Sequence, residues 1–528
     1  MLQSRLLLLY PIALLFFSQC APTNEPQATT PGTVLFESSY KAPAFLEDQR
    51  RQAILEVKNE VENLIKQQMA DRHMPGAAYG LVVDNELVIS GAFGKSNLEE
   101  DIDATTTTKF RIASMSKSFT AMAIVHLRDA GQLSLDDEAS SYLPEMAKLR
   151  YLTSDAPPIR IKNLLTMTGG FPEDNPWGDR QLDEPEQMLM DLMSSEPSFS
   201  NVPAFGYEYS NTGYALPGSI VTQVSGMPYQ QYIRKEIFEP LGMNDTYWEY
   251  DSVPDAELAI GYRWEDEQWK LEPMLHDGSF GAMGGLVTSI EDFSKYVSFH
   301  LSAWPPRNTP DEGPVRRSSL REMHTPQYPR LSANSTNHKG EPCATMRGYG
   351  YGLGVTTDCE GHVIVGHGGA LPGFGSNYYF FPKYGIGLMA FGNLTYTSPW
   401  PREIVMHELI LDGAKPAARW LPPSDILLER KEQVLELIQN WDESLGTEIL
   451  AENFYLDKSR EHHVKDWAAL WQKAGAIQTV GDFEARNQLR GGFEIETKNG
   501  ILDIFFTLSP EPDPKVQRIY PRFTEAEE

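Results

Sequence analysis

The sequence predicts a mixed α/β (α+β) protein with a large domain at residues 46–418 and a small α+β domain at residues 419–528. The chain of 528 residues exceeds the usual size of one domain. Segments with apolar residues at helical spacing occur beside β-branched runs typical of strands. Near Arg419 the composition changes, and a Pro-Pro pair precedes two helical patterns followed by strand patterns.

Charge and composition narrow the classes of function. Hydrophobic residues make up 41% and aromatic residues 11% of the chain, which is ample for a folded core. The formal net charge of -28 argues against nucleic acid as a partner, because phosphate binding needs a basic face that this composition can hardly supply. A strongly acidic surface mainly favours solubility.

Residues 1–20 have the pattern of a secretory signal peptide. Arg5 precedes an apolar run at residues 6–17, which is too short to span a bilayer comfortably. Residues 21–45 begin with a Pro/Thr-rich stretch suited to an extended tether. Export is therefore predicted.

The three cysteines leave two questions open. Cys20 ends the apolar run as in a bacterial lipoprotein signal, which the segment resembles, although Phe17 and Gln19 depart from the small-residue pattern of such signals. The alternatives are a membrane-anchored lipoprotein lipidated at Cys20 and a periplasmic bacterial protein cleaved after Cys20. In an exported chain, Cys343 and Cys359 either form a disulfide or remain two free thiols.

Periodicity predicts the first elements of the large domain. Residues 46–72 carry apolar residues at helical spacing, and this pattern ends before a Met-Pro-Gly sequence. Residues 76–97 predict two strands around the turn Asp84-Asn85.

The stretch FRIASMSKSFTA at residues 110–121 begins the next helix, which ends near Gly131. Ser114 and Lys117 lie three residues apart, so within one helix the hydroxyl and the amine can meet. A hydroxyl beside an amine that has lost its proton is an activated nucleophile, and the N-terminus of a buried helix can stabilise negative charge. The alternative is that a serine caps the helix and Lys117 is solvated, because S-x-x-K spacing alone is common by chance.

Two further signals follow along the chain. Tyr209-Ser210-Asn211 precedes another apolar helix, where Asn211 could serve only as a cap and Tyr209 as a core ring with a satisfied hydroxyl. A β-branched run ends in His367-Gly368-Gly369, and two glycines at a strand edge let a ligand approach the backbone closely. A lone His-Gly-Gly is usually only a turn.

In this order the three signals resemble the serine β-lactamase and penicillin-binding protein superfamily, and within it the class C β-lactamase-like branch. That branch carries S-x-x-K, then Y-x-N, then a Lys- or His-x-Gly strand, and it includes D-alanyl-D-alanine carboxypeptidases and esterases. The resemblance spans residues 45 to about 415. It implies a two-lobed β-lactamase/transpeptidase-like fold, with an antiparallel sheet flanked by helices and an all-helical lobe.

The resemblance also implies roles for the residues that match the motifs. Ser114 would attack a carbonyl and become acylated, and neutral Lys117 would receive its proton. Tyr209 would act as general acid and base between Ser114 and the leaving group. Asn211 would hold the amide side chain of the substrate. The backbone N–H groups of Ser114 and of Ala370, which follows Gly369 on the edge strand, would hold the oxyanion.

His367 is a departure, because the well-known β-lactamases carry lysine in that position. If His367 anchors an anionic substrate, binding is expected to strengthen below about pH 6.5, the ordinary pKa of histidine. If it only donates a neutral hydrogen bond or shapes the strand, binding does not change through that range. A weaker anchor fits esterases and D-amino-acid peptidases as well as β-lactamases, so the substrate class stays open.

Together these features predict an exported serine hydrolase that cleaves a β-lactam, a D-alanyl peptide or a small ester. The alternative is a non-catalytic penicillin-binding or sensor protein that uses the same pocket. No cofactor and no metal are expected, because no H-E-x-x-H or comparable ligand set occurs and the rings of His462 and His463 diverge in a helix. The expected partners are a small-molecule or peptide substrate and, through a lipidated Cys20, a membrane.

The predicted C-terminal domain has two helical patterns, the second with Trp467 and Trp471 on one face, and then three or four strands. Its order of elements is similar to that of the cystatin/NTF2-like roll. No catalytic constellation occurs in it, so we predict an accessory domain whose two tryptophans belong to its core.

Overall fold

The computed structural model describes residues 37–526. The predicted signal peptide, Cys20 and most of the tether therefore lie outside the described residues. Within the described range, no helix is both long enough and apolar enough to cross a membrane.

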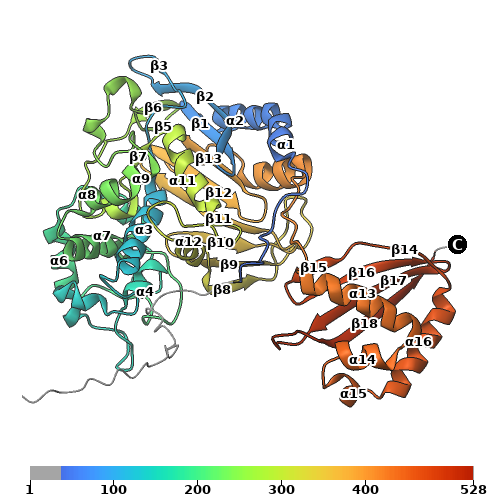
Figure 1. Cartoon of the computed structure of the whole chain (residues 1–528). Helices are drawn as coiled ribbons and strands as arrows, with labels where there is room; N and C mark the ends of the chain where they lie inside the picture. The colour runs from blue at the N-terminus through green and yellow to red at the C-terminus, as the bar shows by residue number, and fades with distance from the viewer. Residues whose placement is uncertain (1–36, 527–528) are drawn as a thin grey trace, which may run out of the picture. The chain divides into compact units, whose positions relative to one another are not determined.

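A nine-stranded antiparallel sheet organises the first part of the chain, in the order β3-β2-β1-β13-β12-β11-β10-β9-β8 (Figure 1). Its strands are β1 Gly76–Val83, β2 Glu86–Asn97, β3 Ile102–Asp103, β8 Gln327–Ser332, β9 Thr345–Tyr349, β10 Gly354–Thr357, β11 Val363–Leu371, β12 Phe374–Phe381 and β13 Ile386–Gly392. The mixed α/β architecture with an antiparallel sheet is confirmed, and so are the two strands around Asp84-Asn85.

The central strand β1 is buried on both faces. Alternate residues of a strand point to opposite sides of a sheet, and accordingly Ala78 and Val82 belong to one hydrophobic core while Tyr79 and Leu81 belong to another. The strand lies beside β13, with Gly80 opposite Met389, so segments about three hundred residues apart meet at the centre of the sheet.

Helices cover both faces of the sheet. Helix α11 (Ile290–Ser302) packs against β1 and β13 on one face. Helices α1 (Arg50–Glu56) and α2 (Lys58–Arg72) and the π-helix η7 (Ile404–Ala414) share the core of the other face. The helix predicted over residues 46–72 is thus two helices. It begins only at Arg50 because the Asp48 carboxylate accepts hydrogen bonds from the Arg50 N–H and guanidinium and holds the preceding residues in a turn.

The remaining helices gather beside the sheet, and most of them form a helical region, drawn in cyan and green in Figure 1. They are α3 Lys117–Asp129, α4 Ile161–Leu165, α5 Asn175–Gly178, α6 Glu186–Ser194, α7 Asn211–Ser225, α8 Tyr229–Ile233, α9 Glu239–Leu241, α10 Gly281–Gly284 and α12 Arg317–Met323. Short strands β4 Phe110–Arg111, β5 Tyr262–Glu265, β6 Gln268–Leu271 and β7 Val287–Thr288 form two small two-stranded sheets.

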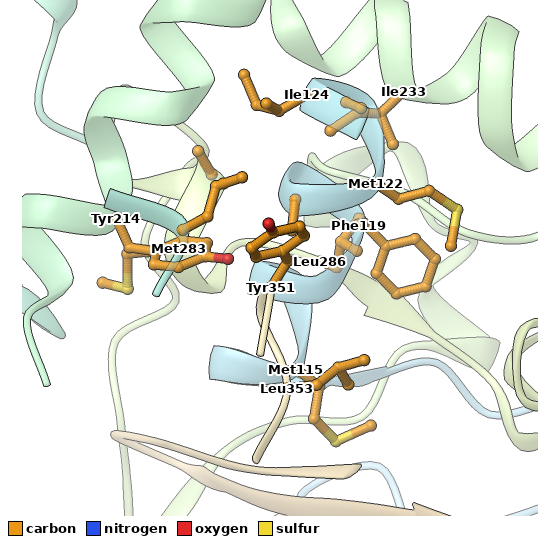
Figure 2. Packing of buried hydrophobic residues seen from close by; sticks show 14 of the residues in the cluster. Met115, Phe119, Met122, Ile124, Tyr214, Ile233, Met283, Leu286, Tyr351 and Leu353 are labelled. Carbon is orange, nitrogen blue, oxygen red and sulfur yellow. The ribbon is translucent and has the colours of Figure 1, made fainter. Parts of the chain in front are cut away.

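Helix α3 is the buried axis of this region. Figure 2 shows Met115, Phe119, Met122 and Ile124 projecting from it and from the turn before it into a cluster with residues of other helices, among them Tyr214 of α7. Nearly every residue of α3 is buried. Any catalytic group at its start is therefore held on a rigid support.

Of the two alternatives for the cysteines, the structure contains the disulfide. Cys343 is bonded to Cys359, which lies in the loop between β10 and β11. The bond ties this loop to the segment that enters β9.

The C-terminal residues form a core of their own. Helices α13 Asp425–Asn440, α14 Glu443–Ile449, α15 Phe454–Asp457 and α16 Arg460–Ala474 precede strands β14 Ile477–Val480, β15 Glu484–Asn487, β16 Arg490–Thr497, β17 Gly500–Leu508 and β18 Val516–Glu525. The five strands exceed the predicted three or four, because the short, largely exposed β14 has no alternating apolar pattern. Trp467 belongs to this core and Trp471 packs against it, which confirms the prediction for the two tryptophans. The domain boundary at residue 419 stays a prediction.

Candidate active site

Ser114 stands at the entrance to α3, in a single 3-10 turn (Ala113–Ser116) that runs directly into the helix. The first N–H groups of a helix have no partner within it, so the N–H of Ser114 can donate to a group bound in front of the serine. Ala113 has a φ of 51°. This left-handed backbone costs a non-glycine residue roughly 1–2 kcal/mol, and it directs the chain sharply into the serine turn.

Lys117 lies one turn further on and is fully buried. Its Nζ lies 2.9 Å from Ser114 Oγ, 2.7 Å from Asn211 Oδ1 and 2.8 Å from the carbonyl oxygen of Met283. Burial lowers the pKa of Lys117 to about 7, against the opposing charges of Asp179 and Asp174. The amine can therefore exist in its neutral form near neutral pH, which a nucleophile-activating lysine requires.

Asn211 is also fully buried, at the start of α7. The helix cap is Ser210, whose side chain accepts from Gly213 N, so the capping alternative for Asn211 is wrong. The Asn211 amide nitrogen points to the carboxamide oxygen of Asn175 and to Asp179, at 3.1 and 3.4 Å, which leaves its oxygen to Lys117. With both ends occupied, this amide orients the lysine, and the contact of Asn211 with a substrate amide stays a prediction.

Asp179 was not singled out from the sequence. It follows α5 and lines the cleft, and burial raises the pKa of its carboxyl group, while the nearby Lys117 charge opposes that rise. Asp174, also unforeseen, accepts from the N–H groups of Asn211 and Thr212 and so fixes the start of α7. Nothing in the sequence marks either residue, because both are ordinary acidic residues of a loop.

Tyr209 lies opposite the serine, with its ring centroid 5.0 Å from Lys117 Nζ. Burial raises its pKa well above the usual value, although a hydrogen bond with Ser114 acts in the other direction. The phenol therefore keeps its proton at neutral pH and is a hydrogen-bond donor, not a phenolate.

His367 forms the far side of the cleft on β11. Its Nε2 lies 2.8 Å from the Tyr349 hydroxyl and its Nδ1 contacts the carbonyl oxygen of Gly368. A carbonyl can only accept, so Nδ1 carries the proton and Nε2 accepts from Tyr349. Burial against the cleft walls and the nearby Lys117 lower the pKa of His367 to about 4. The expectation of protonation near pH 6.5 is therefore corrected, and the ring is neutral at neutral pH.

The position of β11 corrects another expectation. The strand lies inside the sheet between β12 and β10 and is not an edge strand. However, β10 pairs only with residues Val363 to Gly366, so the segment from His367 to Leu371 has no strand on that side. This free edge, which includes Ala370, faces the cleft beside Ser114.

Gly369 has a packing reason to be glycine. A Cβ at Gly369 would lie 2.1 Å from the Ile112 carbonyl oxygen and 2.3 Å from Ser376 Oγ. The nearest atoms to a Cβ at Gly368 would be 3.9 Å away, which is ordinary contact. The absence of a side chain lets β11 lie against the serine turn.

We therefore expect Gly369→Ala to lower the free energy of unfolding by about 1–3 kcal/mol through overpacking. Gly368→Ala, its matched control, should change stability by no more than about 0.5 kcal/mol. Urea unfolding of both variants measures the difference. Equal stabilities would contradict the close approach of β11 to Ile112.

These side chains border a cleft of about 810 Å³, whose lining includes Ser114, Asp179, Tyr209, His367 and Ala370. No group of three or more histidine, cysteine, aspartate or glutamate residues suited to a metal ion occurs in residues 37–526. The structure thus brings together all the motif residues predicted from the sequence, with Asn211 behind Lys117 instead of at the cleft surface.

A family model described as Beta-lactamase matches residues 61–409. The chain belongs to the beta-lactamase family. Among curated relatives, Protein flp of Staphylococcus aureus (strain MRSA252) is 27% identical over 355 residues, which cover 66% of this chain and 65% of that protein. The chain thus spans just under two thirds of the length of such relatives. Beta-lactamase-like protein 2 of Dictyostelium discoideum is 31% identical over 256 residues, 47% of this chain and 46% of that protein.

Solved structures support the beta-lactamase family at the level of the fold. The octameric penicillin-binding protein homologue from Pyrococcus abyssi has a TM-score of 0.54 at 23% identity, covering 89% of this chain and 96% of its own. A D-stereospecific amidohydrolase from Streptomyces has a TM-score of 0.50 at 20% identity, covering 64% and 95%. The predicted family and its fold are thereby confirmed, and the family places the chain within the serine hydrolase superfamily.

Proposed function

We propose that this protein is an exported serine hydrolase that cleaves amide or ester bonds through an acyl-enzyme on Ser114. The observation that carries the proposal is the 2.9 Å contact between Ser114 Oγ and a fully buried Lys117 whose pKa is lowered by burial. A lysine used only for structure would be expected to keep its charge in an ion pair, yet the hydrogen-bond partners of Lys117 are neutral oxygens and a methionine sulfur.

The reaction follows from these positions. Neutral Lys117 takes the proton of Ser114 as Oγ bonds to the substrate carbonyl carbon. The N–H groups of Ser114 and Ala370 hold the resulting oxyanion. Tyr209, which keeps its proton, donates to the leaving group as the bond to the carbonyl breaks, and the tyrosine is reprotonated from Lys117. Water then attacks the ester carbonyl as neutral Lys117 takes its proton, and this proton passes to Ser114 Oγ as the ester bond breaks, which releases the acid and restores the serine hydroxyl.

The candidate substrates are a β-lactam, a D-alanyl peptide and a small ester. Support comes from the family and from the Streptomyces D-stereospecific amidohydrolase and penicillin-binding protein homologues that share the fold. A turnover screen with nitrocefin, D-Ala-D-Ala peptides and p-nitrophenyl esters tests the proposal. Turnover of none of them, with a fluorescent penicillin bound only reversibly, would favour the non-catalytic binding protein instead.

Export completes the proposal. The predicted signal at residues 1–20 supports it, and the disulfide between Cys343 and Cys359 is typical of oxidising compartments. Lipidation of Cys20, which would tether the enzyme to a membrane, can be tested by mass spectrometry of the protein purified from a bacterial membrane fraction.

The rate should depend on pH through Lys117. Only the neutral amine can accept the serine proton, so kcat/KM should rise with pH through about 7 and fall below it as the amine becomes charged. The Asp179 charge favours the ammonium form. Asp179→Asn should therefore move the acidic limb to lower pH, whereas Asp155→Asn, an exposed carboxylate outside the cleft, should leave it in place. An unmoved limb in Asp179→Asn would show that another group controls the rate.

A further inference from the structure

A second cavity of about 460 Å³ lies next to the catalytic cleft. The two share Tyr209, His367 and Gly368, so together they form one continuous groove past the catalytic tyrosine and histidine. The lining of the second cavity includes Tyr207, Tyr328 and Tyr349 and several glycines.

The charge of this cavity is opposite to that of the chain as a whole. Arg330, Arg347 and Arg402 line it, and no aspartate or glutamate occurs among the described residues of its lining. The chain carries a net charge of -28, so a purely cationic lining is not what its composition would give by chance. Arg402 is engaged elsewhere, because its guanidinium bonds to Glu403 and to the Tyr379 hydroxyl.

Arg330 and Arg347 are direct partners across the β8–β9 pair. Like charges opposite each other in a sheet are destabilising, so an anion bound between the two guanidinium groups would relieve their repulsion. Within the described residues, the Arg347 guanidinium has no hydrogen-bond or ion-pair partner. Arg330 donates to the Tyr207 carbonyl oxygen at 2.8 Å and lies over the Tyr207 ring. Both guanidinium groups therefore have donors left for an anion.

The backbone at this rim is irregular. The β8–β9 register shifts between Gln327 and Arg330, and Tyr328 has a φ of 49°, which a bulky residue rarely adopts. The Tyr328 hydroxyl bonds to the Ala204 carbonyl oxygen and holds this bulge against the loop before α7. Bulges of this kind commonly redirect a side chain next to a binding site, and Arg330 is the first paired residue after this one.

The direction of β11 identifies the part of the substrate that enters this cavity. The cleft with Ser114 borders His367 to Ala370, whereas the second cavity borders Ile364 to Gly368, further toward the start of the strand. Tyr209 stands between them and, in the proposed reaction, protonates the leaving group. The leaving group therefore lies on the side of the second cavity, and the acyl group lies in the cleft.

We propose that Arg330 and Arg347 form a leaving-group subsite that selects amide or ester substrates with a carboxylate in the leaving group. The inference rests on the proposed function. It deepens that function because His367, neutral at neutral pH, cannot supply a cation for such a carboxylate. Guanidinium groups bind carboxylates in paired hydrogen bonds, and the tyrosine rings can pack against the remainder of the leaving group.

The test compares matched substrates. One pair is 4-nitrophenyl acetate and 3-carboxy-4-nitrophenyl acetate, which differ by one carboxylate on the leaving group. A peptide series, acyl-D-Ala-D-Ala, its C-terminal amide and the α-amide of acyl-D-Ala-D-Glu, which keeps a free side-chain carboxylate, separates an α-carboxylate from a side-chain carboxylate. The measured quantity is the preference, defined as kcat/KM for the carboxylated substrate divided by kcat/KM for the neutral one.

We expect Arg347→Gln and Arg330→Gln each to lower this preference by about 10-fold, the size of a hydrogen bond to a charged group. Arg347→Lys should restore part of it. Arg150→Gln removes an exposed arginine outside both cavities and should leave the preference unchanged. An unchanged preference in the two glutamine variants, including equal losses of kcat/KM for both substrates, would overturn the subsite.

A binding measurement keeps the subsite separate from the proposed function. The carboxylated leaving group, 5-hydroxy-2-nitrobenzoate, should bind the Ser114→Ala protein more tightly than 4-nitrophenol does, and Arg347→Gln in that background should remove the difference. Loss of turnover for every substrate with this binding intact would reject the hydrolase and keep the subsite. Turnover without this difference in binding would reject the subsite and keep the hydrolase.

Discussion

Replacing Ser114 by alanine is expected to lower kcat/KM on the order of 10⁵–10⁶-fold with the fold intact. Without Oγ no acyl-enzyme forms, and Lys117 and Tyr209 then have no proton to exchange with a nucleophile. The serine side chain makes hydrogen bonds with Lys117 and with Tyr209, so the free energy of unfolding should change by only about 1–3 kcal/mol. Turnover of a p-nitrophenyl ester and urea unfolding measure the two effects.

Ser116→Ala is the matched control, because Ser116 lies in the same turn. Its hydroxyl donates to the Ala113 carbonyl oxygen and accepts from Leu286 N, so it holds the turn and does not contact the cleft. We expect this variant to lose stability and keep most of its activity. Labelling by a fluorophosphonate should survive in Ser116→Ala and vanish in Ser114→Ala. Wild-type turnover by Ser114→Ala would remove the basis of the proposed mechanism.

The contact between Ser114 and Lys117 could be predicted from the sequence because it is local. Two side chains three residues apart at the start of one helix meet whatever the rest of the chain does. The contact of Lys117 with Asn211 is long-range, and the resemblance to a known family predicted only that both residues belong to one site. The direction of the Asn211 amide depends on Asn175 and Asp179, whose loop carries no motif.

In the fold, too, local pairings could be predicted from the sequence and long-range pairings could not. The pair β1–β2 follows from alternation around a two-residue turn, whereas the pairing of β1 with β13 depends on packing that no local pattern encodes. The protonation of His367 could not be predicted either, because it depends on Tyr349, Gly368 and Lys117 around the ring. The pairing of Arg330 with Arg347 required the β8–β9 register, which is shifted by a bulge.

The second large effect is expected for Lys117→Met, which should lower kcat/KM by about 10³–10⁴-fold. Methionine is unbranched and similar in volume, so it fills the buried space but cannot accept the serine proton. Ser114 keeps its position and its oxyanion donors, and for that reason the loss should be smaller than in Ser114→Ala. Stopped-flow acylation by a chromogenic ester measures the rate of this step directly.

The stability of the same variant is a balance of two opposite terms. Removing the amine ends the cost of burying a group that can carry charge. It also removes the hydrogen-bond donor of Asn211 Oδ1 and one donor of the Met283 carbonyl oxygen. Each group left unsatisfied costs about 1–3 kcal/mol. The net change should therefore be modest, and the loss of rate cannot be attributed to unfolding.

The pH profile decides whether Lys117 is the base. In the wild type, the limb near pH 7 reports the fraction of neutral amine; in Lys117→Met the residual acylation should lose that limb, because the titrating group is gone. Met122→Leu, a change within the core around α3 that keeps the amine, is the control for general loosening of the helix and should retain the limb. If the limb persisted in Lys117→Met, another group would be titrating. The proton of Ser114 would then have to leave toward Tyr209. The raised pKa of Tyr209 makes its phenolate scarce at neutral pH. Because that route would require a phenolate the site does not stabilise, the geometry favours the lysine.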